Sequence, residues 1–273
     1  MWIRTFGRGL ALVAVLALAA PMLTATAAQA QVNVVLGGPA TGEVETRDAA
    51  LVETAMAAFQ ARGYAGLRSH LPRLRAALDG APKTYATIES VSAREWVVRS
   101  NNDQDALLLS LMASAMVQQE TSAGPVTVTA RPNVYPLIAL LLGSEAVERG
   151  AMEEAIGYLD QGLALQPAHA SLAAEKMGAM QAQGRMAEAL AVGDAVLAAN
   201  AMPPLSEGMG ILNRRRGFSL IELGRLDEAR TAFNQSLVHD PDNATALSEL
   251  AYIDGLEAGQ APVPGTAIAP KGD

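Results

Sequence analysis

Few side chains in this sequence could take part in catalysis or bind a metal ion. The only histidines are His70, His169 and His239, and none belongs to an HExxH pattern, which places two zinc-binding imidazoles on one helix face. There is no cysteine, so a thiolate zinc site, a cysteine nucleophile and a disulfide are all excluded. No GxSxG motif is present. We therefore predict a protein that is not an enzyme and that uses neither a metal nor another cofactor.

Two short segments could bind anions. Residues 37–42 are rich in glycine but lack the Lys-Ser/Thr ending of a phosphate-binding loop. Arg214, Arg215 and Arg216 form the densest run of positive charge. This run is either a solvated helix face or, with Arg214 nearest the partner, an anchor for a carboxylate. The chain as a whole has a net charge of −8, so we expect no nucleic-acid partner.

The first thirty residues have the features of a secretory leader. Arg4 and Arg8 precede an unbroken Ala, Leu and Val run from residue 10 to residue 20, and Ala28-Gln29-Ala30 matches the small-x-small pattern of a cleavage site. The run is about half as long as the roughly 20 residues that span a bilayer. We expect cleavage after Ala30 and a periplasmic or secreted protein without a membrane span. A retained N-terminal anchor is the alternative.

Residues 31–47 contain Gly, Pro and Thr without a helical period and are predicted to be a flexible lead-in. Apolar residues at helical spacing then predict a helix over residues 48–61 and a second over 64–78, separated by Gly63. Pro72 is expected to kink the second helix. This helical pair is either a degenerate repeat or a separate hairpin.

The segment from residue 83 to residue 100 has strand-like composition and predicts a short β-hairpin that turns near Ser92-Ala93. A helix over residues 103–119 follows, and its apolar residues on most sides indicate a buried position. Residues 48–120 thus make up an irregular N-terminal helical region. Residues 121–135, with Gly124, Pro125 and Pro132, are expected to be a connector.

After residue 135, one motif recurs with a period close to 34 residues. A glycine is followed five residues later by an alanine, in the pairs Gly150/Ala155, Gly184/Ala189 and Gly224/Ala229. The first two glycines are 34 residues apart and the third follows after 40, so an insertion is expected at residues 204–209. Glycine can adopt positive φ in a turn between helices, and acidic residues follow each turn, where a helix dipole favours them.

This pattern resembles the tetratricopeptide repeat, in which each unit is a pair of antiparallel helices. The family places small residues where the two helices cross, bulky residues beside them, and a proline after the second helix. Matching residues in this chain are Gly143, Ala155, Pro167, Gly217, Ala229, Phe233 and Pro241. The middle unit departs from the family, because Met177 stands at a small position and Gly193 at a bulky one.

The resemblance implies a mainly α fold. We expect an α-solenoid of stacked helical hairpins, with units at residues 136–169, 170–203 and 210–243, after the less regular N-terminal region. A helix over residues 244–257 would cap the stack, as solenoids require, and residues 258–273 are expected to be disordered.

In this family the first helix of each unit lines a groove that binds a protein or peptide. The corresponding residues of this chain are Leu137, Leu140, Ser144, Val147, Glu148, Gln181, Ile211, Arg214, Phe218, Ile221 and Glu222. The set is more apolar than polar, and the Lys/Asn clamp that some members use to hold a carboxylate is absent. Such a groove would suit a helix or an extended apolar segment.

The leading hypothesis is a non-catalytic protein-binding module in the periplasm, acting as an adaptor, scaffold or chaperone in envelope assembly or secretion. One alternative is a small-molecule or glycan binder, or an enzyme, built on residues 83–119. Another is a structural subunit that associates with itself.

Overall fold

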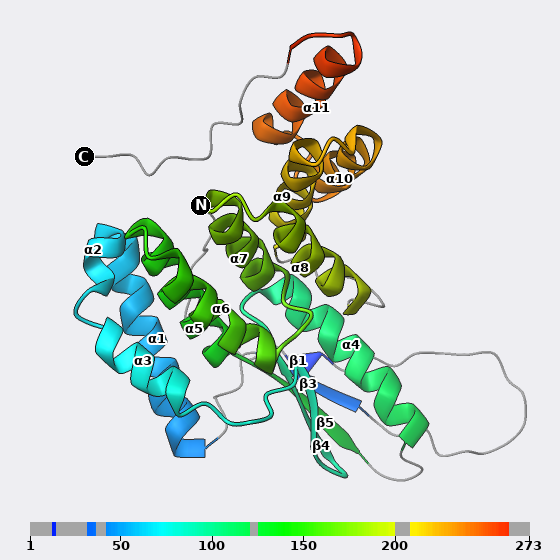
Figure 1. Ribbon diagram of the computed structural model, residues 1–273. Helices are drawn as coiled ribbons and strands as arrows, with labels where there is room; N and C mark the ends of the chain where they lie inside the picture. The colour runs from blue at the N-terminus through cyan, green and yellow to red at the C-terminus, as the bar shows by residue number, and fades with distance from the viewer. Residues whose placement is uncertain (1–12, 15–31, 37–41, 121–124, 200–207, 262–273) are drawn as a thin grey trace, which may run out of the picture. The chain divides into compact units, whose positions relative to one another are not determined.

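The computed structural model describes residues 13–14, 32–36, 42–120, 125–199 and 208–261 of the chain (Figure 1). The chain divides into two compact units. The sheet unit comprises residues 1–46 and 85–133, and the helical unit comprises residues 47–84 and 134–273. None of the helices in the described ranges is both long and apolar enough to cross a lipid bilayer.

A five-stranded sheet in the order β1-β2-β5-β4-β3 forms the centre of the sheet unit. The strands are β1 (Val13–Ala14), β2 (Val32–Val35), β3 (Ile88–Ser92), β4 (Glu95–Arg99) and β5 (Val126–Arg131). Strand β5 is parallel to both β2 and β4, whereas β1/β2 and β3/β4 are antiparallel pairs. Helix α4 (Asp103–Glu120) connects β4 to β5 and packs against both strands. This connection is a β-α-β unit, because parallel strands need a long crossover.

The predicted β-hairpin is confirmed as β3 and β4, but three expectations for this region are wrong. Val126–Arg131 is a central strand and not part of a connector, and Val32–Val35 is a strand within the predicted lead-in. Helix α1 (Gly42–Arg62) begins six residues before the predicted start at Asp48. The strands were missed because each is short and its partners lie far away in the sequence, so no local pattern marks the pairing.

Helix α4 is buried on one side only. Ala106, Leu109, Ala113 and Val117 are buried, whereas Leu107, Leu111 and Met116 are 46%, 42% and 40% exposed. The prediction of a buried helix is therefore confirmed for one side of α4 and wrong for the other. Its N-terminus is capped by Asn102, whose side chain accepts a hydrogen bond from the Asp105 amide at 2.8 Å and donates one to the Asp105 carboxylate at 3.0 Å.

The helical unit is an α-solenoid of consecutive helical hairpins, as the resemblance implies. After α1 come α2 (Tyr64–Leu67) and α3 (Leu71–Asp79). The three repeat hairpins are α5 (Val134–Glu148) with α6 (Met152–Leu165), α7 (Ala170–Ala182) with α8 (Met186–Ala199), and α9 (Met209–Glu222) with α10 (Leu226–His239). Helix α11 (Ala244–Glu257) follows. The insertion predicted at 204–209 and the tail predicted at 258–273 lie largely outside the described residues.

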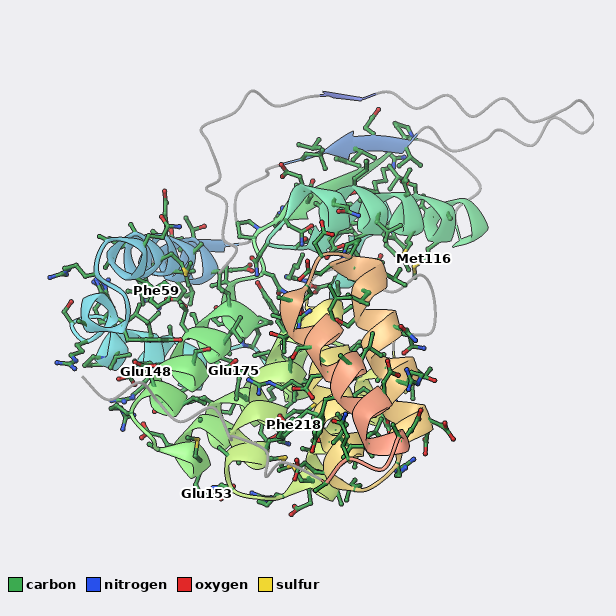
Figure 2. The ribbon with its side chains drawn as sticks, turned by 90° about the horizontal axis from the view of Figure 1, so that it is seen from above. Phe59, Met116, Glu148, Glu153, Glu175 and Phe218 are labelled. Carbon is green, nitrogen blue, oxygen red and sulfur yellow. The ribbon has the colours of Figure 1, made fainter. Side chains whose placement is uncertain are left out.

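The helical pair predicted over residues 48–61 and 64–78 also differs from its prediction at Pro72. Pro72 does not kink a continuous helix, because α2 and α3 are separate helices and Pro72 lies in the first turn of α3. A proline is tolerated there, since the amide groups of a first turn have no partner within the helix. The rings of Phe59 (labelled in Figure 2) and Tyr64 meet edge to face with their centroids 5.1 Å apart, which joins α1 to α2.

Glycines form the turns inside the three repeat hairpins. Gly150, Gly184 and Gly224 have φ values of 76°, 73° and 71°, as the sequence predicts. This left-handed conformation costs a residue with a Cβ atom roughly 1–2 kcal/mol, so glycine is favoured. Helices α6 and α10 end two residues before Pro167 and Pro241 respectively.

The small residues predicted at the crossings of the first and third repeat hairpins are closely packed. A Cβ atom on Gly143 would lie 2.6 Å from the Leu159 side chain, and one on Gly217 would lie 2.5 Å from the Phe233 ring. Ala155 and Ala229, on the second helices, are fully buried. The two helices of a hairpin can therefore approach only because these positions lack larger side chains.

Gly217→Ala tests this packing, with Gly157→Ala as the matched control. The first change is expected to lower the free energy of unfolding by about 1–2 kcal/mol, because the new methyl group overlaps the Phe233 ring. The second should be neutral or raise it by up to about 1 kcal/mol, because nothing lies within 4 Å of a Cβ atom on Gly157 and alanine favours helix. Urea denaturation of both variants measures the difference. Equal effects would show that the crossing is loosely packed.

The middle hairpin differs from the other two at its crossing. Ala189, the small residue predicted on its second helix, is fully buried on α8, but the first helix contributes Met177 to the same apolar cluster in place of a small residue. Ala189 is therefore a packing residue, as predicted, in a crossing that departs from the small-against-small pattern of the family. The volume of Met177 must be accommodated elsewhere in the hairpin.

The space for the Met177 side chain is provided by Gly193, which stands where the family has a bulky residue. Met177 is fully buried, and a Cβ atom on Gly193 would lie 2.9 Å from its sulfur and 2.7 Å from the Arg216 stem. The methionine therefore fills the space that the glycine leaves. This exchange of sizes explains the departure of the middle unit from the repeat pattern.

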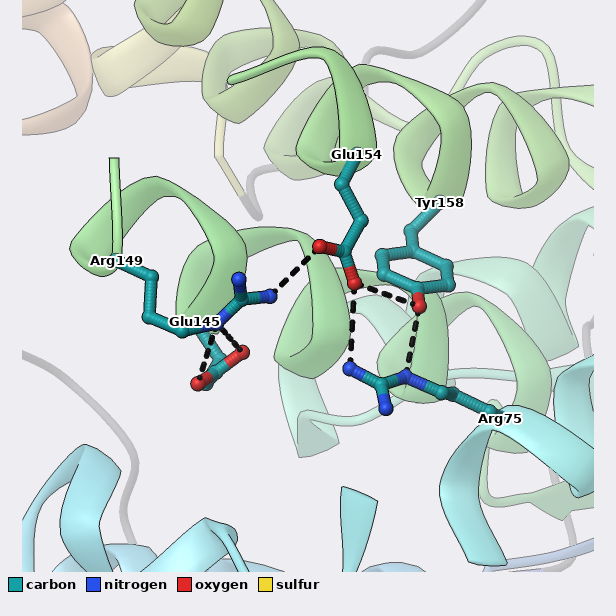
Figure 3. Close-up of polar contacts among 5 residues, drawn as sticks. All are labelled: Arg75, Glu145, Arg149, Glu154 and Tyr158. Carbon is teal, nitrogen blue, oxygen red and sulfur yellow. Dashed lines mark hydrogen bonds and ion pairs between the residues drawn. The ribbon is translucent and has the colours of Figure 1, made fainter. Parts of the chain in front are cut away.

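A polar network joins α3 to the first repeat hairpin (Figure 3). Arg75 donates hydrogen bonds to the Tyr158 hydroxyl at 2.8 Å and to the Glu154 carboxylate at 3.2 Å. Glu154 also accepts hydrogen bonds from Tyr158 at 3.0 Å and from Arg149 at 2.9 Å. Helix α3 packs against α5 much as α6 packs against α7 and α8 against α9. Helix α3 is thus stacked on the first repeat hairpin.

Glu154→Gln should weaken the pH dependence of stability. The hydrogen bond from Arg149 is the largest influence that holds the pKa of Glu154 below its usual value, although burial opposes it. A lowered folded-state pKa stabilises the fold above the unfolded-state pKa, and this contribution disappears as the pH falls through the folded-state value. The carboxylate is 37% exposed, so we expect less than about 1 kcal/mol. Urea denaturation at pH 7 and pH 3 should show a smaller fall in the free energy of unfolding for the variant than for the native chain. Equal falls in the two proteins would contradict this prediction.

Candidate functional site

The first helices of the repeats lie side by side. Helix α5 contacts α7, α7 contacts α9, and α9 contacts α11, while each second helix packs against the first helices before and after it. On each first helix, the partly or fully exposed residues that share one face by their helical spacing form what we call the first-helix surface. Its members are Leu137, Leu140, Ser144, Glu148, Glu175, Gly178, Ile211, Arg215, Phe218, Glu222 and Glu249.

Most of the residues predicted to line the groove are accessible on this surface. Glu148, Ile211 and Glu222 are exposed, and Leu137, Leu140, Ser144 and Phe218 are half-buried. Val147 is also half-buried, but it packs against the apolar cluster that contains Met177. Figure 2 labels Glu148 and Phe218 on the first and third of these helices.

Three other predicted groove residues have partners inside the fold. Gln181 is 4% exposed and donates hydrogen bonds to the Arg215 carbonyl at 2.7 Å and the Ser219 hydroxyl at 2.8 Å, which ties α7 to α9. Arg214 donates to the Ser236 hydroxyl at 3.1 Å and lies 3.7 Å from the Asp240 carboxylate, so it holds α9 against α10. Ile221 packs against the apolar cluster around Phe233. These contacts indicate structural roles.

Arg215, and not Arg214, is the arginine of the first-helix surface. Its guanidinium donates a hydrogen bond of 3.4 Å to the Gln181 side chain, and a Cβ atom on Gly178 would lie 2.8 Å from it. Burial lowers the pKa of Arg215, and the nearby Glu175 carboxylate opposes this shift. Arg216 is bound to Asp194 on α8 by hydrogen bonds of 2.9 and 2.7 Å. Gly178 is the one sequence feature that could have pointed to Arg215, because its missing side chain leaves room for the guanidinium.

Tyr64 brings α2 to one edge of this surface. Burial raises the pKa of the Tyr64 phenol, the carboxylates of Glu175 and Glu148 raise it further, and the Ser144 hydroxyl acts in the opposite direction. These groups therefore lie close together. Sequence reasoning missed Tyr64 and Glu175, because Tyr64 is outside the repeat and Glu175 is not among the groove positions carried over from the family.

Ion pairing differs between the first-helix surface and the rest of the repeats. Within the described part of residues 134–261, every Arg and Lys except Arg215 lies within 4.0 Å of a carboxylate. By contrast, Glu148, Glu175, Glu222 and Glu249 form no side-chain hydrogen bond or ion pair with any described residue. Asp227 and Asp242 also lack an ion pair, but they lie at or just before helix N-termini, where the dipole stabilises them.

A second polar cluster lies in the sheet unit. Arg99 is 5% exposed; its guanidinium forms an ion pair with Glu89 at 2.6 Å, donates to the Ala86 carbonyl at 2.7 Å, and stacks 4.1 Å above the Tyr85 ring centroid. The Tyr85 hydroxyl donates to Glu45 at 2.5 Å. Trp96 is 3% exposed. Arg99 is thus engaged by the fold itself and is not presented to a ligand.

Comparison with known families identifies the third hairpin. The family description "Tetratricopeptide repeat" matches residues 211–243, which span α9 and α10. The chain therefore contains a tetratricopeptide repeat. The two hairpins before this repeat have the same helical arrangement and the same turn glycines. No curated protein matches the sequence.

Several solved tetratricopeptide repeat (TPR) structures are similar to the chain. The first TPR of Spaghetti (RPAP3) bound to an HSP90 peptide is 24% identical, over 45% of this chain and 93% of that one, with a TM-score of 0.40. MamA from AMB-1 is 17% identical, over 78% and 89%, with a TM-score of 0.42. A thermophilic TPR protein of Thermus thermophilus is 16% identical, over 76% and 98%, with a TM-score of 0.37. These scores are too low to assign a ligand to this chain.

Proposed function

We propose that this protein is a non-catalytic module that binds a protein or peptide on its first-helix surface. The observation that carries the proposal is the contrast between this surface and the rest of the repeats. Here apolar side chains such as Leu140 and Phe218 remain partly exposed, and four carboxylates form no ion pair. Elsewhere on the described repeats the charged side chains are paired, apart from Asp227 and Asp242 near helix N-termini. Stacked tetratricopeptide hairpins present such surfaces to partners.

Capture of partners from a cell-envelope extract tests this proposal. Phe218→Ala is expected to reduce capture at least tenfold, because truncation of an aromatic contact residue often costs about 2 kcal/mol of binding energy. Val238→Ala is the matched control, since Val238 is 77% exposed on the second helix α10 and should bind as well as the native chain. Circular dichroism and thermal unfolding must show both variants folded. Equal capture by the two variants would contradict the proposal.

We further propose that the protein acts in the periplasm as an adaptor, scaffold or chaperone in envelope assembly or secretion. The support is the leader-like sequence of residues 1–30. Intact-mass measurement of protein from the periplasmic fraction should give a chain that begins at Gln31. Such a chain lacks the edge strand β1, which pairs with β2 in the full-length chain. Recovery of the full-length chain in the cytoplasm would argue against export.

Self-association is a second candidate function, favoured by two apolar residues on the exposed side of α4. Leu107 and Leu111 lie one turn apart there and are 46% and 42% exposed, and such residues often mark protein contacts. Light scattering coupled to size-exclusion chromatography would detect a dimer, which Leu111→Glu should dissociate. A monomer at high concentration would rule this function out. The ligand-binding alternative at residues 83–119 is not favoured, because Trp96 and Arg99 are buried within the fold.

A further inference from the structure

We infer that the partner segment is cationic, with Lys or Arg side chains placed between apolar ones. This inference rests on the proposed function and specifies the chemistry of its partner. It departs from the sequence-based alternative in which Arg214 anchors an acidic group, because the structure engages Arg214 with Ser236 on α10 and with Asp240 directly after it.

The first reason is the position of the four surface carboxylates that form no hydrogen bond or ion pair with a described residue. Glu148 is on α5, Glu175 on α7, Glu222 on α9 and Glu249 on α11, so each first helix contributes one. Glu148 and Glu175 both lie close to the Tyr64 phenol, and Glu222 lies close to Glu249. The negative charge therefore extends along the whole row of first helices and is not a single local group.

The second reason is the cost of leaving these groups without a cation. Glu249 is half-buried, and burial raises its pKa, with the Glu222 carboxylate adding to the rise. A carboxylate that is partly removed from water beside a like charge is destabilised. A cationic side chain placed between Glu222 and Glu249 would relieve both effects at once, which favours Lys or Arg in the partner.

The third reason is that the protein supplies almost no competing cation on this surface. Arg215 is the one positive side chain among its members, and it already lies beside Glu175. Other arginines near α9 are used within the fold: Arg216 binds Asp194, and Arg230 binds Asp254 and Glu257. An acidic segment would meet four carboxylates against one guanidinium, so charge complementarity selects a basic one.

The apolar members of the surface explain why charge alone would not define the partner. Leu137, Leu140, Ile211 and Phe218 remain partly exposed between the carboxylates. They can bury apolar side chains of the partner, and the Phe218 ring can also accept a cation above its face. An amphipathic basic segment fits both kinds of group.

The test is selection of random twelve-residue peptides displayed on phage against the immobilised full chain. Enriched peptides are then synthesised, and their affinities are measured by fluorescence anisotropy at low and high salt. The variant Glu175→Gln/Glu249→Gln removes two surface carboxylates. The matched control Glu153→Gln/Glu188→Gln removes the same charge from the starts of α6 and α8, where both residues already pair with Arg185. Figure 2 labels Glu153 and Glu175.

We expect enrichment of Lys- and Arg-containing peptides, weaker binding at high salt, and a roughly tenfold affinity loss in the surface variant but not in the control. Enrichment of acidic or uncharged peptides that depend on Phe218 would overturn the charge inference and leave the proposed function standing. No enrichment, or peptides that bind Phe218→Ala as tightly as the native chain, would overturn both.

Discussion

Phe233→Ala is expected to lower the free energy of unfolding by about 3–5 kcal/mol, the largest effect of any single change considered for the repeats. The Phe233 side chain is 1% exposed and packs in one apolar cluster with Leu220, Ala229 and Ile253. Because its ring also fills the space above Gly217, truncation leaves a cavity at the crossing of α9 and α10. Urea denaturation followed by circular dichroism measures the loss.

The control for this prediction is Val238→Ala on the same helix. Val238 is 77% exposed, so its truncation should change stability by less than about 0.5 kcal/mol. A loss of under about 1 kcal/mol for Phe233→Ala would mean that the third hairpin is not packed as described. Because α9 carries Arg215 and Phe218, we also expect the destabilised variant to lose partner binding on heating before the native chain does.

The second large effect concerns the exchanged residues of the middle hairpin. Met177→Ala should cost about 2–5 kcal/mol, because it empties a fully buried site. Gly193→Leu alone should cost about 1–3 kcal/mol, because the new side chain meets Met177 and the Arg216 stem. The double variant restores the sizes found in the family. Its loss of unfolding free energy should therefore be smaller than the sum of the two single losses by about 1–3 kcal/mol.

A double-mutant cycle with urea denaturation measures this coupling. The pair Met177 and Gly157 provides a control cycle, since Gly157 has nothing within 4 Å of its missing Cβ atom. Strictly additive losses for Met177 and Gly193 would show that the two positions do not share one volume, and the explanation of the irregular repeat would then be wrong.

The repeat array could be predicted from sequence because its determinants are local and recur. Gly150, Gly184 and Gly224 each require a left-handed turn, and Gly143 and Gly217 each require a close helix crossing. Five residues of this kind at repeated spacing fix the hairpins without any knowledge of distant contacts. The alternating composition of residues 88–99 was likewise enough to predict the hairpin of β3 and β4.

The remaining features depend on contacts that no local pattern records. Strand β5 is defined by parallel neighbours, β2 and β4, that lie far from it in the sequence. The choice between Arg214 and Arg215 depends on which side of α9 each faces, and a shift of one position turns a side chain by about 100°. Tyr64 reaches the first-helix surface only because α2 packs beside α5.

Hydrogen–deuterium exchange of the full chain, with and without a bound partner or selected peptide, would locate the binding surface on the helices. We predict that binding slows exchange in α5, α7, α9 and α11, while exchange in α6, α8 and α10 changes little. Slower exchange confined to the second helices, or to β3, β4 and α4, would place the binding site elsewhere and contradict the assignment of the first-helix surface.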